Sequence, residues 1–227
     1  MKRSKRYTAS VKQVEPGHVY SLEESIKILK QNPVKFDAGV EIHIKLGIDP
    51  KKSEQVVRGT VVLPHGTGKT KRVAAFVSPA KEAEAREAGA DVIGTEEVIA
   101  EIKKTGKCNF DIAVATPDMM KKIGQIAKIL GQQGLMPNPR TETVGPDVKK
   151  MVTELKKGKV AFRSDDSGNV HLLIGRVSYE AKQIIENIQA FTESLRKAKP
   201  AEAKGIFIGA VTVSSSMGPG VRISIGS

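Results

Sequence analysis

The chain contains little cysteine, and this limits the chemistry it can perform. Cys108 is the single cysteine among 227 residues, so an intramolecular disulfide is excluded and nothing points to an oxidising compartment. The four histidines stand far apart, so the ligand spacing of a zinc site is absent and no metal or other cofactor is expected. No apolar run approaches the roughly 18 residues of a membrane span, and no apolar segment follows the basic amino terminus. We therefore expect a cytoplasmic protein without a membrane partner.

Aromatic and acidic side chains are also scarce. The chain has three Tyr, six Phe and no Trp. No segment has the aromatic strand with which RRM domains stack bases, so binding of single-stranded nucleic acid by stacking is disfavoured. The 37 Lys and Arg outnumber the 25 Asp and Glu, which leaves a net charge of +12 and a pI near 9.7. A polyanion is therefore the expected partner.

The excess positive charge is uneven along the chain. Residues 70–158 hold 15 basic and 12 acidic side chains, whereas the two terminal segments together hold 22 and 13. The net charges are +3 and +9, so the terminal segments are the expected binding region. Part of this charge belongs to an amino-terminal group that we interpret as a solvated arm, namely Lys2, Arg3, Lys5 and Arg6.

The terminal segments have the pattern of an α+β domain. Ser21 and Glu24 predict a capping box before a helix over 22–29. Strict alternation predicts a half-buried strand over 40–48 with Glu41, His43 and Lys45 on its polar face, and a second strand is expected over 59–63. Near the other terminus, strands over 160–163 and 170–174 are predicted to form a hairpin. A long helix over 184–195 and a strand over 206–213 follow.

The middle segment alternates between strands and helices. Apolar strands are predicted over 73–77, 91–93 and 112–115, with helices over 80–88, 96–104, after Pro117 and over 148–155. The predicted fold class is α/β. An α+β domain is built from residues 1–67 and 159–227, and an inserted domain from residues 68–158 has parallel strands with helices on both faces. The connections contain Gly66, Gly68 and Gly158, which are expected to act as a hinge.

The strongest functional signal is the turn that follows Val213, which has the sequence Ser214-Ser215-Ser216-Met217-Gly218-Pro219-Gly220. Small hydroxyls, free backbone amides and glycines suit the close approach of a sugar or phosphate. Gly218 is expected to permit that approach, or a positive φ, and to matter little for stability. Because such groups match the 2′-hydroxyls and phosphates of folded RNA, the turn predicts an RNA-binding site. A polar turn without a ligand is the alternative.

Motifs for catalysis are weak. Gly68-Lys69-Thr70 matches the end of a phosphate-binding P-loop, but Leu63 stands where the motif needs a glycine, and a strand is predicted where it needs a helix. Asp165 and Asp166 form a carboxylate pair, yet acidic residues in a turn usually accept local backbone hydrogen bonds. We favour a binding protein that is not an enzyme. The alternative is a phosphate- or nucleotide-binding enzyme that uses the Gly68-Lys69-Thr70 segment.

Several longer motifs occur in order along the chain: Lys35-Phe36-Asp37, Leu46-Gly47-Ile48-Asp49-Pro50, Val57-Arg58-Gly59, Leu63-Pro64-His65-Gly66-Thr67-Gly68-Lys69, Gly134-Leu135-Met136-Pro137-Asn138-Pro139 and Ser216-Met217-Gly218-Pro219. Together they closely resemble the bacterial form of the ribosomal protein L-one family, the stalk proteins of the large subunit. The resemblance covers essentially the whole chain.

The resemblance implies a two-domain protein that is monomeric outside the ribosome. Its terminal domain is expected to bind a mobile stalk of large-subunit rRNA, and its inserted domain to have a three-layer, Rossmann-like α/β fold. The resemblance further implies a role in releasing deacylated tRNA from the exit site. It also implies repression of the protein's own mRNA, through a similar RNA structure in the mRNA leader.

The family's RNA contacts correspond in this chain to Lys35, Phe36, Arg163, His171, Ser216, Met217 and Gly218. The turn selected from the residues alone is thus also selected by the resemblance. The chain departs from the family at two places. Gly39 replaces a usual Thr, which affects one hydroxyl contact to RNA. Gln132-Gln133 replaces Pro-Arg, which removes a charge from the inserted domain and affects any RNA contact made there.

Overall fold

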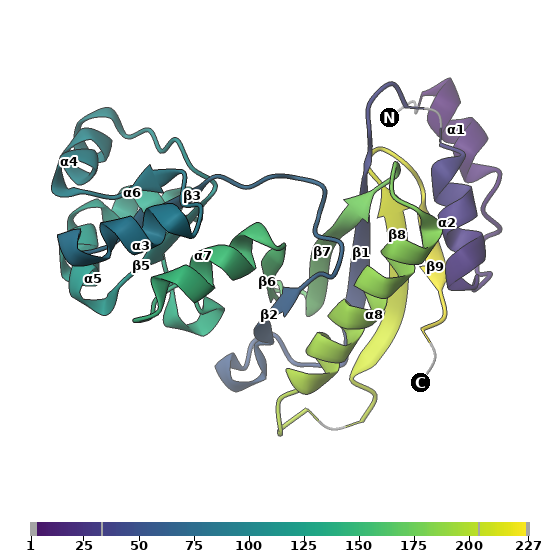
Figure 1. The fold of residues 1–227 in the computed structure, drawn as a ribbon. Helices are drawn as coiled ribbons and strands as arrows, with labels where there is room; N and C mark the ends of the chain where they lie inside the picture. The colour runs from purple at the N-terminus through teal and green to yellow at the C-terminus, as the bar shows by residue number, and fades with distance from the viewer. Residues whose placement is uncertain (1–3, 33, 204, 226–227) are drawn as a thin grey trace. The chain divides into compact units, whose positions relative to one another are not determined.

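A computed structural model describes residues 4–32, 34–203 and 205–225 of the chain. The chain divides into two compact units, Met1–Gly68 with Ala161–Ser227, and Lys69–Val160. We call them the terminal unit and the inserted unit. Both contain helices and sheets (Figure 1), which confirms the predicted α/β fold class.

The terminal unit is built around a four-stranded antiparallel sheet. Figure 1 shows its strands side by side in the order β7 (Asn169–Arg176), β1 (Gly39–Leu46), β8 (Ile208–Ser215) and β9 (Gly220–Ile223). The alternation predicted for β1 is confirmed, because Ile42, Ile44 and Leu46 are buried while His43 is half-buried and Lys45 is exposed. The paired registers place a set of polar side chains on one face, which we call the outer face: Glu41, His43, Lys45, His171, Thr212, Ser214 and Arg222.

Two helices contact the strands of this sheet and bury apolar stripes. Helix α2 (Leu22–Lys30) begins at the predicted capping box, where Ser21 Oγ accepts from the Glu24 amide and Glu24 accepts from the Ser21 amide. Helix α8 (Ala181–Lys197) buries Ile184, Ile188, Phe191 and Leu195. Since alternate residues of a strand point to opposite faces, these helices cover the apolar face, opposite the outer face. A shorter helix, α1 (Lys5–Val11), precedes α2.

The predicted hairpin over residues 160–174 is wrong. Strand β6 (Lys159–Arg163) pairs with β2 (Arg58–Val62) in a separate two-stranded sheet, whereas β7 pairs with β1. The β-pairing between the two sides of the turn consists of one isolated bridge, between Ser164 and Val170. The alternative partner is favoured by packing, because Gly59 of β2 lies against the ring of Phe162, which is buried. Strand β6 also crosses the boundary between the two units.

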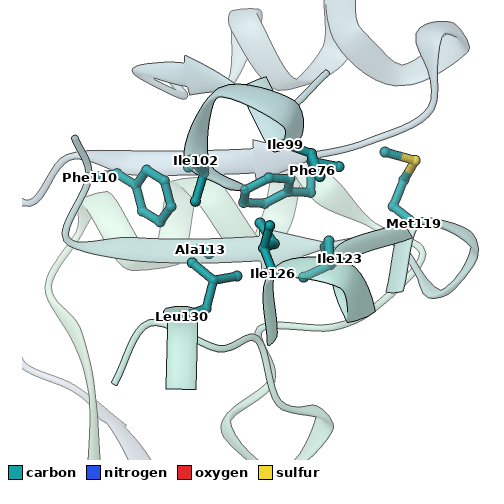
Figure 2. Close-up of a cluster of buried hydrophobic side chains, with 11 residues drawn as sticks. Phe76, Ile99, Ile102, Phe110, Ala113, Met119, Ile123, Ile126 and Leu130 are labelled. Atoms are coloured by element: carbon teal, nitrogen blue, oxygen red, sulfur yellow. The ribbon is translucent and has the colours of Figure 1, made fainter. Parts of the chain in front are cut away.

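The inserted unit contains a parallel three-stranded sheet in the order β4 (Val92–Ile93), β3 (Val73–Phe76) and β5 (Ile112–Ala115). Its helices are α3 (Glu82–Glu87), α4 (Glu96–Thr105), α5 (Pro117–Ile123), α6 (Ala127–Gln132) and α7 (Val148–Lys156). Ala74 and Phe76 pack in one buried cluster with side chains of α4, α5 and α6 (Figure 2). Val73 and Ala75 pack in a second cluster with α3 and α7. Both faces of this sheet are therefore apolar and covered, as is usual for parallel strands.

Candidate nucleic-acid interface

The turn singled out in the sequence joins β8 to β9 and is fixed by backbone hydrogen bonds. The Ser216 amide donates to Gly39 O at 2.8 Å, and the Gly218 amide donates to Ser215 O at 2.8 Å. Met217 has φ 62°, a left-handed conformation that costs a non-glycine residue about 1 kcal/mol or more. Its side chain nevertheless remains 70% exposed. A strained residue with an exposed apolar side chain is a common feature of binding surfaces.

The three serines of the turn differ in their surroundings. Strand β8 extends to Ser215, whose side chain is buried and whose Oγ accepts from Asn32 Nδ2 at 3.1 Å. Ser214 and Ser216 are half-buried. Two of the three hydroxyls are thus accessible to a ligand, and the middle one belongs to the interior.

Gly218 has no room for a side chain, so we now expect substitutions at this position to destabilise the protein, contrary to the expectation from the sequence. A Cβ built on Gly218 would lie 2.3 Å from Ser215 Oγ and 2.9 Å from Asn32 Nδ2. The positive φ in this turn belongs to Met217, and the φ of Gly218 does not lie in the left-handed region. The sequence analysis allowed for a positive φ at Gly218, because glycine adopts it most easily.

The segment before β1 adjoins the same turn. Gly39 O accepts from both the amide and the hydroxyl of Ser216, at 2.8 and 3.4 Å. Phe36 lies three residues earlier and is 50% exposed, and Lys35 is exposed. The exposure of Phe36 shows that it is a surface side chain and not a buried anchor. A Cβ at Gly39 would contact the end of the flexible Leu173 side chain and Ser216 Oγ.

A chain of hydrogen bonds crosses the outer face. His43 and His171 are directly opposite each other in β1 and β7, with their Nδ1 atoms 2.8 Å apart. His43 Nε2 lies 3.0 Å from Ser214 Oγ, and His171 Nε2 lies 3.3 Å from Asp165 Oδ2. Burial lowers the pKa of His43 from its usual value of 6.5, and the charge of His171 lowers it further. Because the two Nδ1 atoms lie within hydrogen-bond distance, one of them must donate a hydrogen to the other.

Asp165 organises the turn that precedes β7. Its carboxylate accepts from the amides of Ser167 and Asn169 at 2.9 and 2.7 Å. The backbone bond from Asn169 is the main cause that lowers the pKa of Asp165 to about 2. The interpretation of this acidic residue as a local acceptor is confirmed, and Asp165 holds a position from which it also orients His171.

Arg6 is not part of a solvated arm, and that interpretation is wrong for this residue. Residues Lys5–Val11 form α1, capped by Ser4, and Arg6 is half-buried. Its guanidinium donates from Nη1 to Asn32 Oδ1 at 2.7 Å and from Nη2 to the Met217 carbonyl at 3.1 Å. Lys2 and Arg3, which were assigned to the same arm, lie outside the described residues. The sequence signal for this helix was Ser4, an N-cap residue placed just before it.

The remaining candidates lie away from the turn. Arg163 is exposed on β6, in the two-stranded sheet. The turn that follows it leads to Asn169, which pairs with Lys45, whereas Ser216 bonds to Gly39 at the other end of β1. At about 3.4 Å per residue, those two ends of β1 are roughly 20 Å apart. The structure thus joins the Ser216-Met217-Gly218 turn to Gly39, three residues after Phe36 and four after Lys35, places His171 on the same sheet and places Arg163 on another sheet.

The expected hinge glycines all have positive φ, at 65° for Gly66, 74° for Gly68 and 101° for Gly158. Gly66 is held in the terminal unit, because its carbonyl accepts from Asn187 Nδ2 at 3.0 Å and its amide donates to Leu63 O. Gly68 lies close to the side chain of Arg176, with no room for a Cβ. The positive φ therefore favours glycine at both positions, and at Gly68 a Cβ would also lack space.

Within the described ranges, no three His, Cys, Asp or Glu side chains gather in a way that would hold a metal ion. The same part of the chain has no helix long and apolar enough to cross a membrane. The segment after Thr70 leads into strand β3, as predicted, so the helix that a P-loop needs to hold phosphates does not follow Lys69.

A model of the Ribosomal protein L1p/L10e family matches residues 27–219. The chain belongs to this family. It is therefore a ribosomal protein of the large subunit that binds rRNA, and its family is one of structural ribosomal proteins and not of enzymes. The matched segment ends directly after the Ser216-Met217-Gly218 turn and begins within α2, so α1 and Arg6 precede it.

Sequence reasoning about this ribosomal protein missed several residues at the turn. They are Arg6, which donates to the Met217 carbonyl, and Asn32 and Ser215, which lie next to Gly218. His43 was placed on the polar face of its strand, but its pairing with His171 and Ser214 required the strand order. The available signal was the alternation of β1. It shows on which face of the sheet His43 lies, but not which strands are adjacent to β1.

Proposed function

We propose that the terminal unit binds the mobile rRNA stalk of the large subunit through one surface, the β8–β9 turn with the Lys35-Phe36 segment and the adjoining outer face. The observation that carries this proposal is Met217, which is exposed and held in a strained backbone conformation next to the strand that Lys35 and Phe36 precede. Exposed apolar side chains among hydroxyls and cations suit folded RNA, whose sugars and phosphates present matching groups.

The sheet face supports the same proposal by its composition. His43, Lys45, His171, Thr212 and Arg222 place donors and cationic groups in adjacent strands. Such groups position a phosphate backbone without reading bases, so affinity should depend strongly on salt. The terminal segments also hold the larger net charge, +9 against +3.

A filter-binding titration with fragments of the stalk rRNA tests the proposal. Ser216→Ala should cost about 1–2 kcal/mol of binding, because a half-buried hydroxyl that meets RNA is lost. Ser224→Ala is the matched control, since Ser224 is exposed just beyond the far end of β9. Equal affinities for both variants and the wild type would remove the turn from the interface.

We further propose that the protein acts in the cytoplasm, is monomeric outside the ribosome, assists release of deacylated tRNA from the exit site and represses its own mRNA. The family and the resemblance of its motifs support these roles. Ribosomes lacking the protein should release exit-site tRNA more slowly. A reporter that carries the natural mRNA leader should be repressed more strongly by the wild-type protein than by the Ser216→Ala variant.

We propose that the two connections act as a hinge that lets the units follow a mobile RNA. Gly66, Gly68 and Gly158, each at positive φ, support this assignment. Because Gly66 and Gly68 are bound within the terminal unit, we place the moving bonds after Gly68, at Lys69 and beyond. Fluorophores on the two units should report a broad distribution of distances in the free protein, and a single narrow distribution that rRNA leaves unchanged would contradict the hinge.

A further inference from the structure

A group of polar side chains supports the proposed RNA-binding turn, and it comes from α1 and from Asn32, which follows the end of α2. We call this group the second layer. Arg6 of α1 uses its two terminal nitrogens on two different partners, the Asn32 carboxamide oxygen at 2.7 Å and the Met217 carbonyl at 3.1 Å. The guanidinium group is a rigid planar donor, so these two bonds fix the distance between Asn32 and the turn. A segment 211 residues away in the chain is thus joined directly to the residue with the strained backbone.

Asn32 is the centre of this layer and is 6% exposed. Its Oδ1 accepts from Arg6 and also from Ser10 Oγ at 3.2 Å, while its Nδ2 donates to Ser215 Oγ at 3.1 Å. The assignment of oxygen and nitrogen follows from chemistry, because a guanidinium only donates and must face the oxygen. Both polar side-chain atoms of Asn32 are thereby hydrogen-bonded, and such a network favours one conformation of the side chain.

The contacts of this layer meet at the part of the turn that has unusual geometry. Asn32 and Ser215 fill the space that a Cβ on Gly218 would occupy. Arg6 holds the carbonyl of Met217, the residue with φ 62°. Such a backbone conformation persists in a non-glycine residue only where neighbouring groups determine it. The side chain of Met217 meanwhile points to solvent, 70% exposed, and remains available to a ligand.

We propose that Arg6 is a positioning residue for RNA binding: together with Asn32 it holds the Ser216-Met217-Gly218 turn in its binding conformation, and it acts through the turn instead of through a phosphate. The inference rests on the proposed function of the turn. Helix α1 lies before the segment that the family match covers, so the assignment adds to what the family implies.

The test compares Arg6→Ala with Lys5→Ala, which removes the same charge from an exposed neighbouring position of α1. Binding to stalk rRNA fragments is measured at several salt concentrations. We expect Arg6→Ala to weaken binding about tenfold, as expected for loss of a charge-assisted hydrogen bond, while Lys5→Ala changes it less than about threefold. The slope of log affinity against log salt should be the same for Arg6→Ala as for the wild type, because no phosphate contact is lost.

Arg6→Lys separates geometry from charge. Lysine keeps the charge but lacks the planar fork, so we expect it to restore little of the lost affinity. If Arg6→Lys binds as well as the wild type, and Arg6→Ala reduces the salt slope by about one, Arg6 contacts phosphate directly and the proposal is overturned.

A measurement on the free protein tests the role of Arg6 separately from RNA binding by the turn. With ¹³C-methyl methionine, the Met217 resonance should shift or broaden in Arg6→Ala and stay unchanged in Lys5→Ala, while circular dichroism confirms that both variants are folded. An unchanged Met217 resonance together with wild-type affinity would reject the role of Arg6 and leave the RNA-binding turn intact. Failure of the wild type to bind stalk rRNA would reject the proposed function, whatever the Met217 resonance shows.

Discussion

The sheets of the two units differ in how many of their faces are buried. In the inserted unit every residue of β3 is buried, and apolar clusters pack on both sides of the strand. In the terminal unit β1 alternates, with Ile42 and Ile44 buried and Lys45 exposed. A parallel sheet covered by helices on both faces can contact a partner only through its loops. An antiparallel sheet with one polar face can also bind a partner on that face. The comparison teaches that strand patterning in each unit already determines which kind of surface is available for RNA.

The two units also differ in net charge and in the surroundings of their strained residues. The terminal segments hold a net +9, against +3 for residues 70–158. Met217 is a strained, exposed residue of the terminal unit. The positive-φ non-glycine residue of the inserted unit, Glu142, instead ends a short 3-10 helix and is ion-paired to Lys159. Similar backbone strain thus accompanies a candidate ligand surface in one unit and an ion pair between two residues of the same unit in the other.

Separation of the units gives the largest expected effect. Residues 69–160 alone should bind stalk rRNA at least about a hundredfold more weakly than the whole protein, because most of the net charge and the turn are absent. The terminal unit, with residues 69–160 replaced by a short Gly/Ser linker, should keep affinity within about threefold. Filter binding measures both, and strong binding by the inserted unit would reverse the comparison.

Two Gly→Ala substitutions should change stability with opposite signs. Gly218→Ala is expected to destabilise the protein by about 1–3 kcal/mol, since its Cβ would meet Ser215 Oγ at 2.3 Å. Gly131→Ala, within α6 and with open space around its Cβ, should stabilise the inserted unit by about 0.5–1 kcal/mol. Urea unfolding followed in each unit checks both, and two effects of the same sign would contradict the packing argument.

Met217→Gly should separate stability from binding. Glycine adopts φ 62° without strain, so the free protein should become more stable by about 1 kcal/mol. The exposed apolar side chain is lost at the same time, so rRNA affinity should fall about tenfold. Melting temperature and filter binding are the measurements, and a variant that gains in both would show that the side chain does not contact RNA.

The His43–His171 pair predicts a smaller effect of pH. Burial and His171 lower the pKa of folded His43 below 6.5, so the unfolded chain takes up a proton more readily as pH falls below that value. Stability should therefore decrease below about pH 6.5, by less than about 1 kcal/mol because the pair is partly exposed. RNA phosphates would offset this loss, so rRNA affinity should rise as pH falls. Both trends should weaken in His43→Gln, as measured by urea unfolding and by binding at pH 7.5 and 5.5.

Lys69→Ala should have the smallest effect. Lys69 begins the inserted unit, and one peripheral charge in a screened interface should change rRNA affinity by less than about threefold. ATP and GTP should leave the melting temperature of the wild type unchanged, because the segment after Lys69 continues into β3 instead of a helix. A nucleotide-dependent shift that Lys69→Ala abolishes would support the enzyme alternative.

The amino-acid sequence by itself determined the local elements of this protein. The capping box at Ser21, the alternation in β1 and the apolar strands of the inserted unit are encoded within about ten neighbouring residues. Hydrophobic periodicity acts at that range, so the fold class and most elements could be predicted. The ordered motifs also sufficed to predict the family, and the family match confirms that prediction.

Tertiary structure alone decided which segments meet. It paired β6 with β2 instead of β7, placed the positive φ of the turn at Met217, and joined Arg6 to a turn 211 residues away. It also joined His43 to His171 across two strands. These outcomes depend on which buried donors and acceptors find partners once the sheet has closed, and local periodicity contains no information about partners distant in the chain.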